Sequence, residues 1–163
     1  DEEQWKAAVA AAKEGFGALH MLVNNAGIVS VGPALELDAD EFMRVVRVNQ
    51  LGPFLGMKTA IPVIAESGGG AVVNVASIDG HTGSPGLAHY VGAKHAVLGL
   101  TKTIADEVAR MGVRVNSVSP GGMLTGMDVF AVSDAADKQR VGEQAVEPAA
   151  REGDATAAAP VSV

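Results

Sequence analysis

Cysteine is absent from the 163 residues, and this absence excludes disulfide bonds and thiolate metal ligands. Four histidines are present, but they do not show the carboxylate-backed spacing of a metal site. The sequence therefore predicts no metal centre. A chain without cysteine suits a reducing compartment, so we expect a cytoplasmic protein.

Basic residues are scarce as well. Twelve lysines and arginines stand against nineteen acidic residues, which gives a net charge of −7 and an isoelectric point near 5.0. No lysine- or arginine-rich run offsets this balance, so we expect neither nucleic acid nor an acidic membrane surface as a partner. The sequence also has no apolar run long enough to span a bilayer and no apolar signal region near Asp1.

Aromatic residues make up only 4% of the chain, whereas 48% is hydrophobic and 20 residues are glycine. The length is sufficient for one domain with a substantial core. The glycines gather at the ends of apolar segments, where turns between strands and helices need them. This composition is typical of a buried α/β domain.

Helical and strand-like patterns alternate along the chain. Helical spacing occurs over residues 2–15, 39–65 and 88–111, and short apolar runs typical of strands occur over residues 19–23, 71–76 and 113–118. The alternation predicts right-handed crossovers and a parallel sheet with helices on both faces. In such a fold, ligands bind beyond the carboxyl ends of the strands.

Three local features refine this prediction. Asp38 and Glu41 are spaced as a capping box at the start of the second helix, which should bend or break near Pro53 or Pro62. The run at 19–23 reads as a short buried strand, and the β-branched run at 71–76 reads as a strand buried on both faces.

Polar groups that could handle a proton lie at one edge of this predicted sheet. Ser77 follows a strand, and Tyr90 and Lys94 are one helical turn apart at the start of the next helix. A nearby ammonium favours the phenolate form of tyrosine, and two hydroxyls can polarise a carbonyl oxygen. Alternatively, the tyrosine–lysine spacing is a coincidence and Ser77 caps a turn.

Two further sets of residues have weaker interpretations. His81 and His89 read as solvated loop or helix-start residues, with a place at a substrate mouth as the alternative. Gly80, Gly83 and Gly86 lack the spacing of a dinucleotide-binding fingerprint.

Four motifs in this order resemble the classical short-chain dehydrogenase/reductases. They are Asn24-Asn25-Ala26-Gly27, Asn49, Ser77 with Tyr90-x-x-x-Lys94, and Pro120-Gly121 with Thr125. The resemblance covers residues 1–128. It implies the C-terminal part of a Rossmann-like, doubly wound parallel sheet in three α/β/α layers, without the first βαβαβ half. Residues 129–163 are expected to form an Ala/Glu/Pro-rich tail with a lid segment followed by disorder.

The resemblance also implies a catalytic set of four residues. Tyr90 would be the general acid/base, and Lys94 would bind the nicotinamide ribose and lower the tyrosine pKa. Ser77 would orient the substrate oxygen. Asn49 would hold a helix distortion and a water that links Lys94 to solvent.

The implied cofactor is NAD or NADP, bound by two turns in addition to Tyr90 and Lys94. The residues carried over are Asn25, Ala26, Gly27, Pro120, Gly121, Met123 and Thr125. Asn24 is expected to be structural.

The implied function is the interconversion of a ketone and a secondary alcohol by hydride transfer, with a hydroxysteroid or a 3-oxoacyl thioester as possible substrates. A full-length form would be a homodimer or homotetramer. One alternative is a truncated remnant that acts at most as a folded or oligomerising module. A sugar-nucleotide epimerase or dehydratase shares Tyr-x-x-x-Lys but usually carries a larger C-terminal domain.

Overall fold

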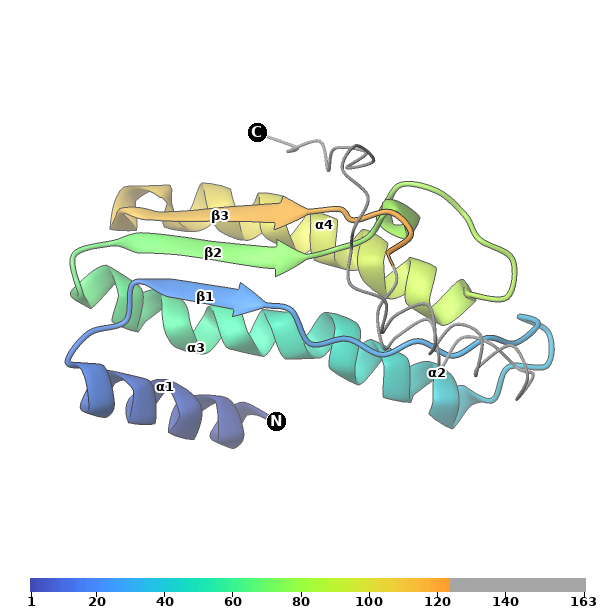
Figure 1. Ribbon diagram of the computed structural model, residues 1–163, viewed down its shortest axis with the longest axis horizontal. Helices are drawn as coiled ribbons and strands as arrows, with labels where there is room; N and C mark the ends of the chain where they lie inside the picture. The colour runs from blue at the N-terminus through green and yellow to red at the C-terminus, as the bar shows by residue number, and fades with distance from the viewer. Residues whose placement is uncertain (124–163) are drawn as a thin grey trace, which may run out of the picture.

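The computed structural model describes residues 1–123. Strands β1 (Met21–Asn24), β2 (Gly70–Val75) and β3 (Val113–Val118) form one parallel sheet in that order. They alternate with the helices that Figure 1 labels α1 (Glu2–Phe16), α2 (Ala39–Val46), α3 (Gly52–Glu66) and α4 (Ala88–Val108). The predicted alternation is confirmed. Thr125 and the predicted tail at 129–163 lie outside the described residues.

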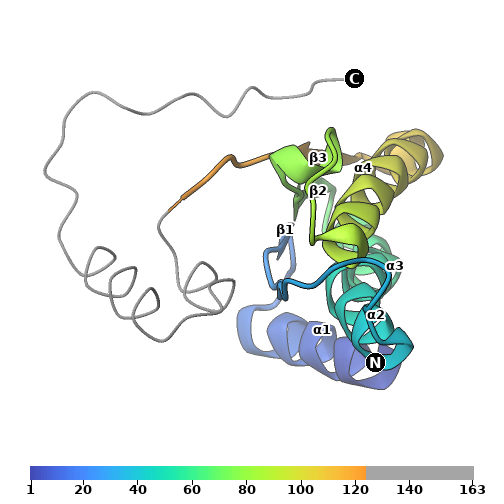
Figure 2. The same cartoon turned by 90° about the vertical axis from the view of Figure 1, so that its right-hand side faces the viewer.

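One face of the sheet carries the core. The strand register aligns Leu22, Val72 and Val115, and Val72 is fully buried on this face. Helices α3 and α4 lie on the same side of the sheet, as Figure 2 shows in a view along the strands. The buried apolar cluster consists of Val9, Met57, Ala60, Ile61, Ile64, Val72, Val108, Val113 and Val115.

The opposite face of the sheet is open among the described residues. Met21 and Val23 of β1 are 61% and 51% exposed, and Val73 of β2 is only partly buried. The predictions that 19–23 is a buried strand and that 71–76 is buried on both faces are therefore wrong. Residues 1–123 supply the sheet and one of the two helical layers of a doubly wound fold.

The helix predicted over 39–65 is interrupted by a π-helical turn, η1 (Arg47–Leu51). Pro53 lies two residues after this turn and has no N–H to donate to the carbonyl of Asn49, so the regular hydrogen-bond ladder cannot pass this point. The structure confirms the predicted break near Pro53. Asn49, at the centre of the turn, is 1% exposed.

The start of α2 confirms half of the predicted capping box. The Asp38 carboxylate accepts hydrogen bonds from the N–H groups of Asp40 and Glu41, at 2.7 and 3.4 Å. Glu41 does not complete the box. Its carboxylate instead accepts hydrogen bonds from Arg44 and Ser30.

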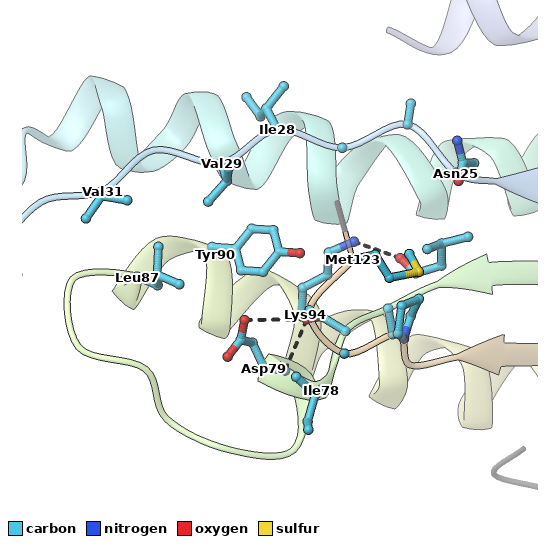
Figure 3. Close-up of a pocket in the computed structure, with 18 of the residues that line it drawn as sticks. Asn25, Ile28, Val29, Val31, Ile78, Asp79, Leu87, Tyr90, Lys94 and Met123 are labelled. Atoms are coloured by element: carbon cyan, nitrogen blue, oxygen red, sulfur yellow. Dashed lines mark hydrogen bonds between the residues drawn. The ribbon is translucent and has the colours of Figure 1, made fainter. Parts of the chain in front are cut away.

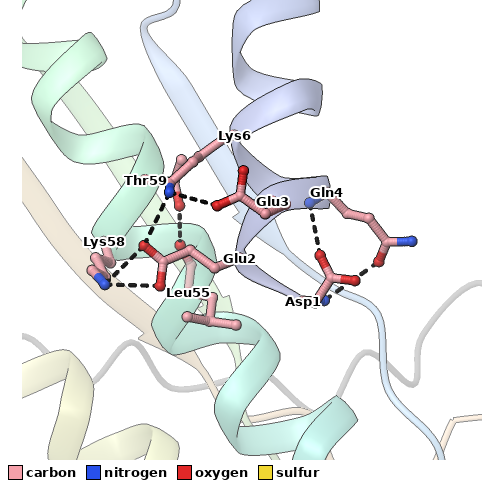
Figure 4. Close-up of polar contacts among 8 residues, drawn as sticks. All are labelled: Asp1, Glu2, Glu3, Gln4, Lys6, Leu55, Lys58 and Thr59. Carbon is pink, nitrogen blue, oxygen red and sulfur yellow. Dashed lines mark hydrogen bonds and ion pairs between the residues drawn. The ribbon is translucent and has the colours of Figure 1, made fainter.

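Helix α1 packs beside α3 through one tight contact and exposed ion pairs. A Cβ at Gly56 would lie 2.6 Å from Asn24 Oδ1 and 2.9 Å from the Trp5 ring, so the close approach requires glycine. Lys58 binds the Glu2 carboxylate at 2.9 Å (Figure 4), but both side chains are partly exposed. Exposed ion pairs contribute about 0–1 kcal/mol, so packing positions α1.

No helix among residues 1–123 combines the length and apolarity needed to cross a bilayer.

The buried side-chain amide of Asn74 links β1, β2 and α4. Asn74 in β2 is 0% exposed, accepts from Asn24 Nδ2 at 2.8 Å and donates to Thr101 Oγ1 at 2.9 Å. Each of these partners needs a hydrogen bond in an apolar layer. The network therefore fixes β1, β2 and α4 relative to one another just below the strand ends.

Replacing Asn74 with alanine should lower the free energy of unfolding by about 2–4 kcal/mol, because the buried Asn24 amide and Thr101 hydroxyl each lose one hydrogen bond. Urea denaturation measures this change. Asn116→Ala is the matched control, since Asn116 lies exposed on the open face of the neighbouring strand. Equal effects of the two substitutions would contradict a structural role for the network.

Candidate active site

An open cavity of about 890 Å³ lies beyond the carboxyl ends of the three strands. The loop after β1, the end of β2, the start of α4 and the turn after β3 all contribute to it. Figure 3 shows Tyr90 and Lys94 projecting into this space from one helix, with residues 28–31 running opposite. The structure thus brings the predicted strand-end residues to one place.

Lys94 is a buried cation with a fixed position. Lys94 is 4% exposed, and its Nζ donates a hydrogen bond to the carbonyl of Val75 at 2.7 Å. Burial lowers the pKa of Lys94 to about 8. The ammonium is therefore tied to the last residue of the central strand.

Tyr90 lies one turn before Lys94 on α4 and is 8% exposed. Nζ of Lys94 is 5.5 Å from the centre of the tyrosine ring. Figure 3 shows the phenol oxygen and the amino group directed toward the same part of the cavity. The predicted tyrosine–lysine neighbourhood is present.

Ser77 follows the central strand by two residues and caps the short 3₁₀ helix η2 (Ile78–Gly80). Its Oγ accepts from the Asp79 N–H at 3.1 Å and lies 3.5 Å from Asp79 Oδ2. The capping role that the sequence left open is real, and the hydroxyl also lines the cavity. The two interpretations of Ser77 are compatible.

Asn49 holds the loop after β1 that borders the cavity. Its Oδ1 accepts from the Ile28 N–H at 2.9 Å, and its Nδ2 donates to the Ile28 carbonyl at 2.7 Å. The residue lies in the π turn, consistent with the expected helix distortion, and does not line the cavity. Its proposed link to Lys94 through water stays a prediction.

The two turns predicted to meet a cofactor lie at the cavity. Its lining includes Asn25, Ala26, Gly27, Pro120, Gly121 and Met123. Asn24 instead points into the core, where it bonds Asn74, as expected for a structural residue. Thr125 lies beyond the described residues.

Several residues of the cavity had no sequence signal. The apolar lining opposite Tyr90 comes from a loop without periodicity, namely Ile28, Val29 and Val31, and Leu87 adds to the lining from the start of α4. Asp79 and Arg44 also line the cavity. Asp79 could have been found from its position two residues after Ser77, whereas Arg44 looks like an ordinary helix-surface residue.

His89 differs from both interpretations given to it. The residue is 0% exposed, so it is neither solvated nor at a substrate mouth. His81 is exposed, and its Nε2 lies 3.0 Å from Ser119 Oγ.

The fold and the site together define a Rossmann-like protein with a serine, a tyrosine and a lysine at its ligand-binding edge. The sequence model of the short chain dehydrogenases matches residues 1–136. The chain belongs to the short-chain dehydrogenase/reductase family.

Individual relatives support this assignment. The chain is 46% identical over 127 residues to trans-4-hydroxycyclohexanecarboxylate dehydrogenase of Sinomonas cyclohexanicum, covering 78% of this chain and 49% of that protein. It is 48% identical over 122 residues to cyclohexanol dehydrogenase of Acinetobacter sp. (strain SE19), covering 74% of this chain and 49% of that protein. The chain thus spans about half the length of these curated relatives.

Solved structures show the same fold. Levodione reductase matches with a TM-score of 0.81 and 37% identity, over 88% of this chain and 57% of that chain. A gluconate 5-dehydrogenase from Burkholderia cenocepacia J2315, in complex with NADP and tartrate, matches with a TM-score of 0.77 and 32% identity, over 83% and 53%.

The lowered pKa of Lys94 predicts a pH-dependent stability. Between pH 8 and the ordinary lysine value of 10.5, the unfolded chain binds more protons at this position than the folded chain. Raising the pH through this window should therefore increase the free energy of unfolding, by up to about 3 kcal/mol from this group. Lys94→Met should remove that contribution.

Urea unfolding of both forms across the window measures the difference. Lys102→Met is the control, because Lys102 is an exposed lysine two turns further along α4. A wild-type profile that matches the Lys94→Met profile would show that the ammonium is not buried in solution.

Proposed function

We propose that the protein is an NAD- or NADP-dependent oxidoreductase that interconverts a secondary alcohol and a ketone. The observation that carries this proposal is the meeting of Ser77, Tyr90 and Lys94 in one cavity at the carboxyl edge of a parallel sheet. Two hydroxyls beside a buried ammonium suit proton transfer to and from an alcohol oxygen.

The residues of the cavity fit a nicotinamide cofactor. An ammonium has three N–H donors, so Lys94 can hold both the Val75 carbonyl and a ribose hydroxyl. The backbone of Asn25, Ala26 and Gly27 offers a narrow polar rim on the same edge. When bound, the cofactor supplies or accepts the hydride.

The chain's own groups then handle the substrate oxygen. In the reducing direction the Tyr90 hydroxyl gives its proton to the carbonyl oxygen, and the Ser77 hydroxyl donates a hydrogen bond to the same atom. The neighbouring Lys94 ammonium stabilises the phenolate that forms. In the oxidising direction the phenolate takes the proton from the alcohol.

The substrate class follows from the lining opposite Tyr90. Ile28, Val29, Val31 and Leu87 are aliphatic, so they suit an alicyclic or aliphatic carbon skeleton. Two relatives act, by name, on hydroxylated cyclohexanes. We therefore infer an alicyclic secondary alcohol such as cyclohexanol as the first substrate to assay.

Cofactor binding is the primary test. Titration of the 163-residue chain into NADH and into NADPH should give a saturable change in nicotinamide fluorescence with at least one of them. Lys94→Met should weaken that binding, whereas Lys102→Met should not. A lack of saturable binding to either would overturn the proposal for this chain and favour the alternative of a non-catalytic folded module.

Turnover tests the role of Tyr90. Tyr90→Phe should reduce kcat for cyclohexanol oxidation by about a thousandfold, because the proton acceptor is lost, while cofactor affinity stays within about twofold. An unchanged kcat would contradict the role given to this tyrosine.

The tyrosine–lysine coupling can also be read without turnover. Tyr90 is the single tyrosine of the chain, so the near-ultraviolet absorbance of the phenolate reports this one group. Lys94→Met should move the midpoint of that titration upward by about one to three pH units, because a cation close to the ring is removed. Lys102→Met should leave the midpoint in place.

A further inference from the structure

His89 sits fully buried directly before Tyr90, in a place where sequence reasoning found only a surface residue. Its ring stacks on Phe42 of α2, with ring centres 6.5 Å apart and an interplanar angle of 29°. A buried imidazole needs a hydrogen-bond partner for its N–H.

A chain of hydrogen bonds supplies that partner. His89 Nε2 lies 2.7 Å from Ser30 Oγ, and Ser30 Oγ donates to Glu41 Oε1 at 2.5 Å. Arg44 clamps the same carboxylate with its Nε and a terminal nitrogen, at 2.6 and 2.7 Å. The chain joins α2, the loop after β1 and the start of α4.

The direction of these bonds fixes the protonation of the imidazole. An ionised carboxylate only accepts, and hydrogen bonds from Arg44 and then Ser30 hold the pKa of Glu41 at about 2. The single Ser30 proton therefore points to Glu41, and Ser30 Oγ must accept from His89. Nε2 then carries a hydrogen, and in the neutral ring Nδ1 carries the lone pair.

The rest of the surroundings agrees with a neutral ring. Nδ1 is buried and makes no hydrogen bond among residues 1–123. Burial lowers the pKa of His89, and among the charged groups facing it Arg44 acts in the same direction. Glu41 and the Leu87 backbone act in the opposite direction but do not outweigh burial.

Ser30 belongs to the segment that bounds the cavity opposite Tyr90. We call residues 28–31 the wall segment; Ile28, Val29 and Val31 line the cavity (Figure 3). Asn49 holds its first residue, and the Gly32 N–H donates to the Gly86 carbonyl at 3.0 Å just beyond its last. Between these two attachments, Ser30 is held by His89.

We propose that His89 is a positioning residue. As a neutral imidazole that donates from Nε2 to Ser30, it fixes the wall segment against the helix turn that carries Tyr90 and so sets the width of the substrate end of the cavity. That the cavity receives the substrate rests on the proposed function. The hydrogen-bond geometry of His89 does not.

Histidine-ring NMR on the full 163-residue chain tests the geometry without substrate or cofactor. His89 should show the Nε2–H tautomer and stay neutral at pH 6.5, the ordinary histidine value. Ser30→Ala should abolish the tautomer preference. A wild-type His89 that shows mixed tautomers and is largely charged at pH 6.5 would overturn the proposal, whether or not the chain is an enzyme.

Amide hydrogen exchange tests the attachment. Ser30→Ala and His89→Leu should each speed exchange of the Gly32 N–H by about fivefold, the effect of losing one hydrogen bond. His89→Gln should restore slow exchange, because its amide can donate to Ser30. His95→Gln, on the exposed side of the same helix, is the control. Rapid exchange of the Gly32 N–H in the His89→Gln variant would contradict the proposal. An exchange rate in Ser30→Ala that equals the wild-type rate would contradict it as well.

If cofactor binding and turnover are established, kinetics separate positioning from general loss of structure. Ser30→Ala should raise KM for cyclohexanol by about fivefold, with kcat and NADH affinity within about twofold. An equal loss in NADH affinity would show that the contact stabilises the whole site rather than its substrate end, and would overturn the assignment.

Discussion

The hydrogen bond between the Lys94 ammonium and the Val75 carbonyl is the contact on which the site depends. It ties the turn of α4 that borders the cavity to the last residue of β2, and Ser77 follows two residues later. Tyr90 is placed by the same contact, because it lies one turn earlier on the helix. Burying a cation costs free energy, so the charged form of Lys94 is locally destabilised at this position.

Two buried polar networks keep that turn in place from either side. Asn74 of β2 secures the core side, because its amide bonds Asn24 of β1 and Thr101 of α4. His89 secures the outer side through Ser30. Each network joins side chains of different elements by hydrogen bonds, and such bonds help polar groups in a protein interior to specify one arrangement. Hydrogen bonds to Asn74 and to Ser30 thus hold α4 at residues on either side of Tyr90 and Lys94 in the sequence.

Most of the fold could be predicted because its signals are local. The strand at Val113–Val118 and the helix break near Pro53 depend on β-branched runs and on a missing N–H, and both can be read along the chain. The exposure of Met21 and Val23 could not be read in this way. An apolar residue looks the same in sequence whether or not a second helical layer covers it among the described residues.

The same distinction between local signals and contacts with distant parts of the chain applies to the site. Ser77, Tyr90 and Lys94 were found because strand ends and helical spacing bring distant residues to one edge. The roles of Asn49 and of the two cofactor turns stay predictions from the family resemblance. His89 could not be found, because its burial comes from a loop contact with Ser30 that no periodicity encodes.

The open face of the sheet affects the thermodynamics of this part of the chain. Met21 and Val23 are already largely hydrated in the folded state. Denaturant sensitivity and the heat-capacity change of unfolding both scale with surface that becomes newly exposed. Residues 1–123 should therefore unfold with a shallower denaturant slope and a flatter stability curve than an equally long domain with both sheet faces covered.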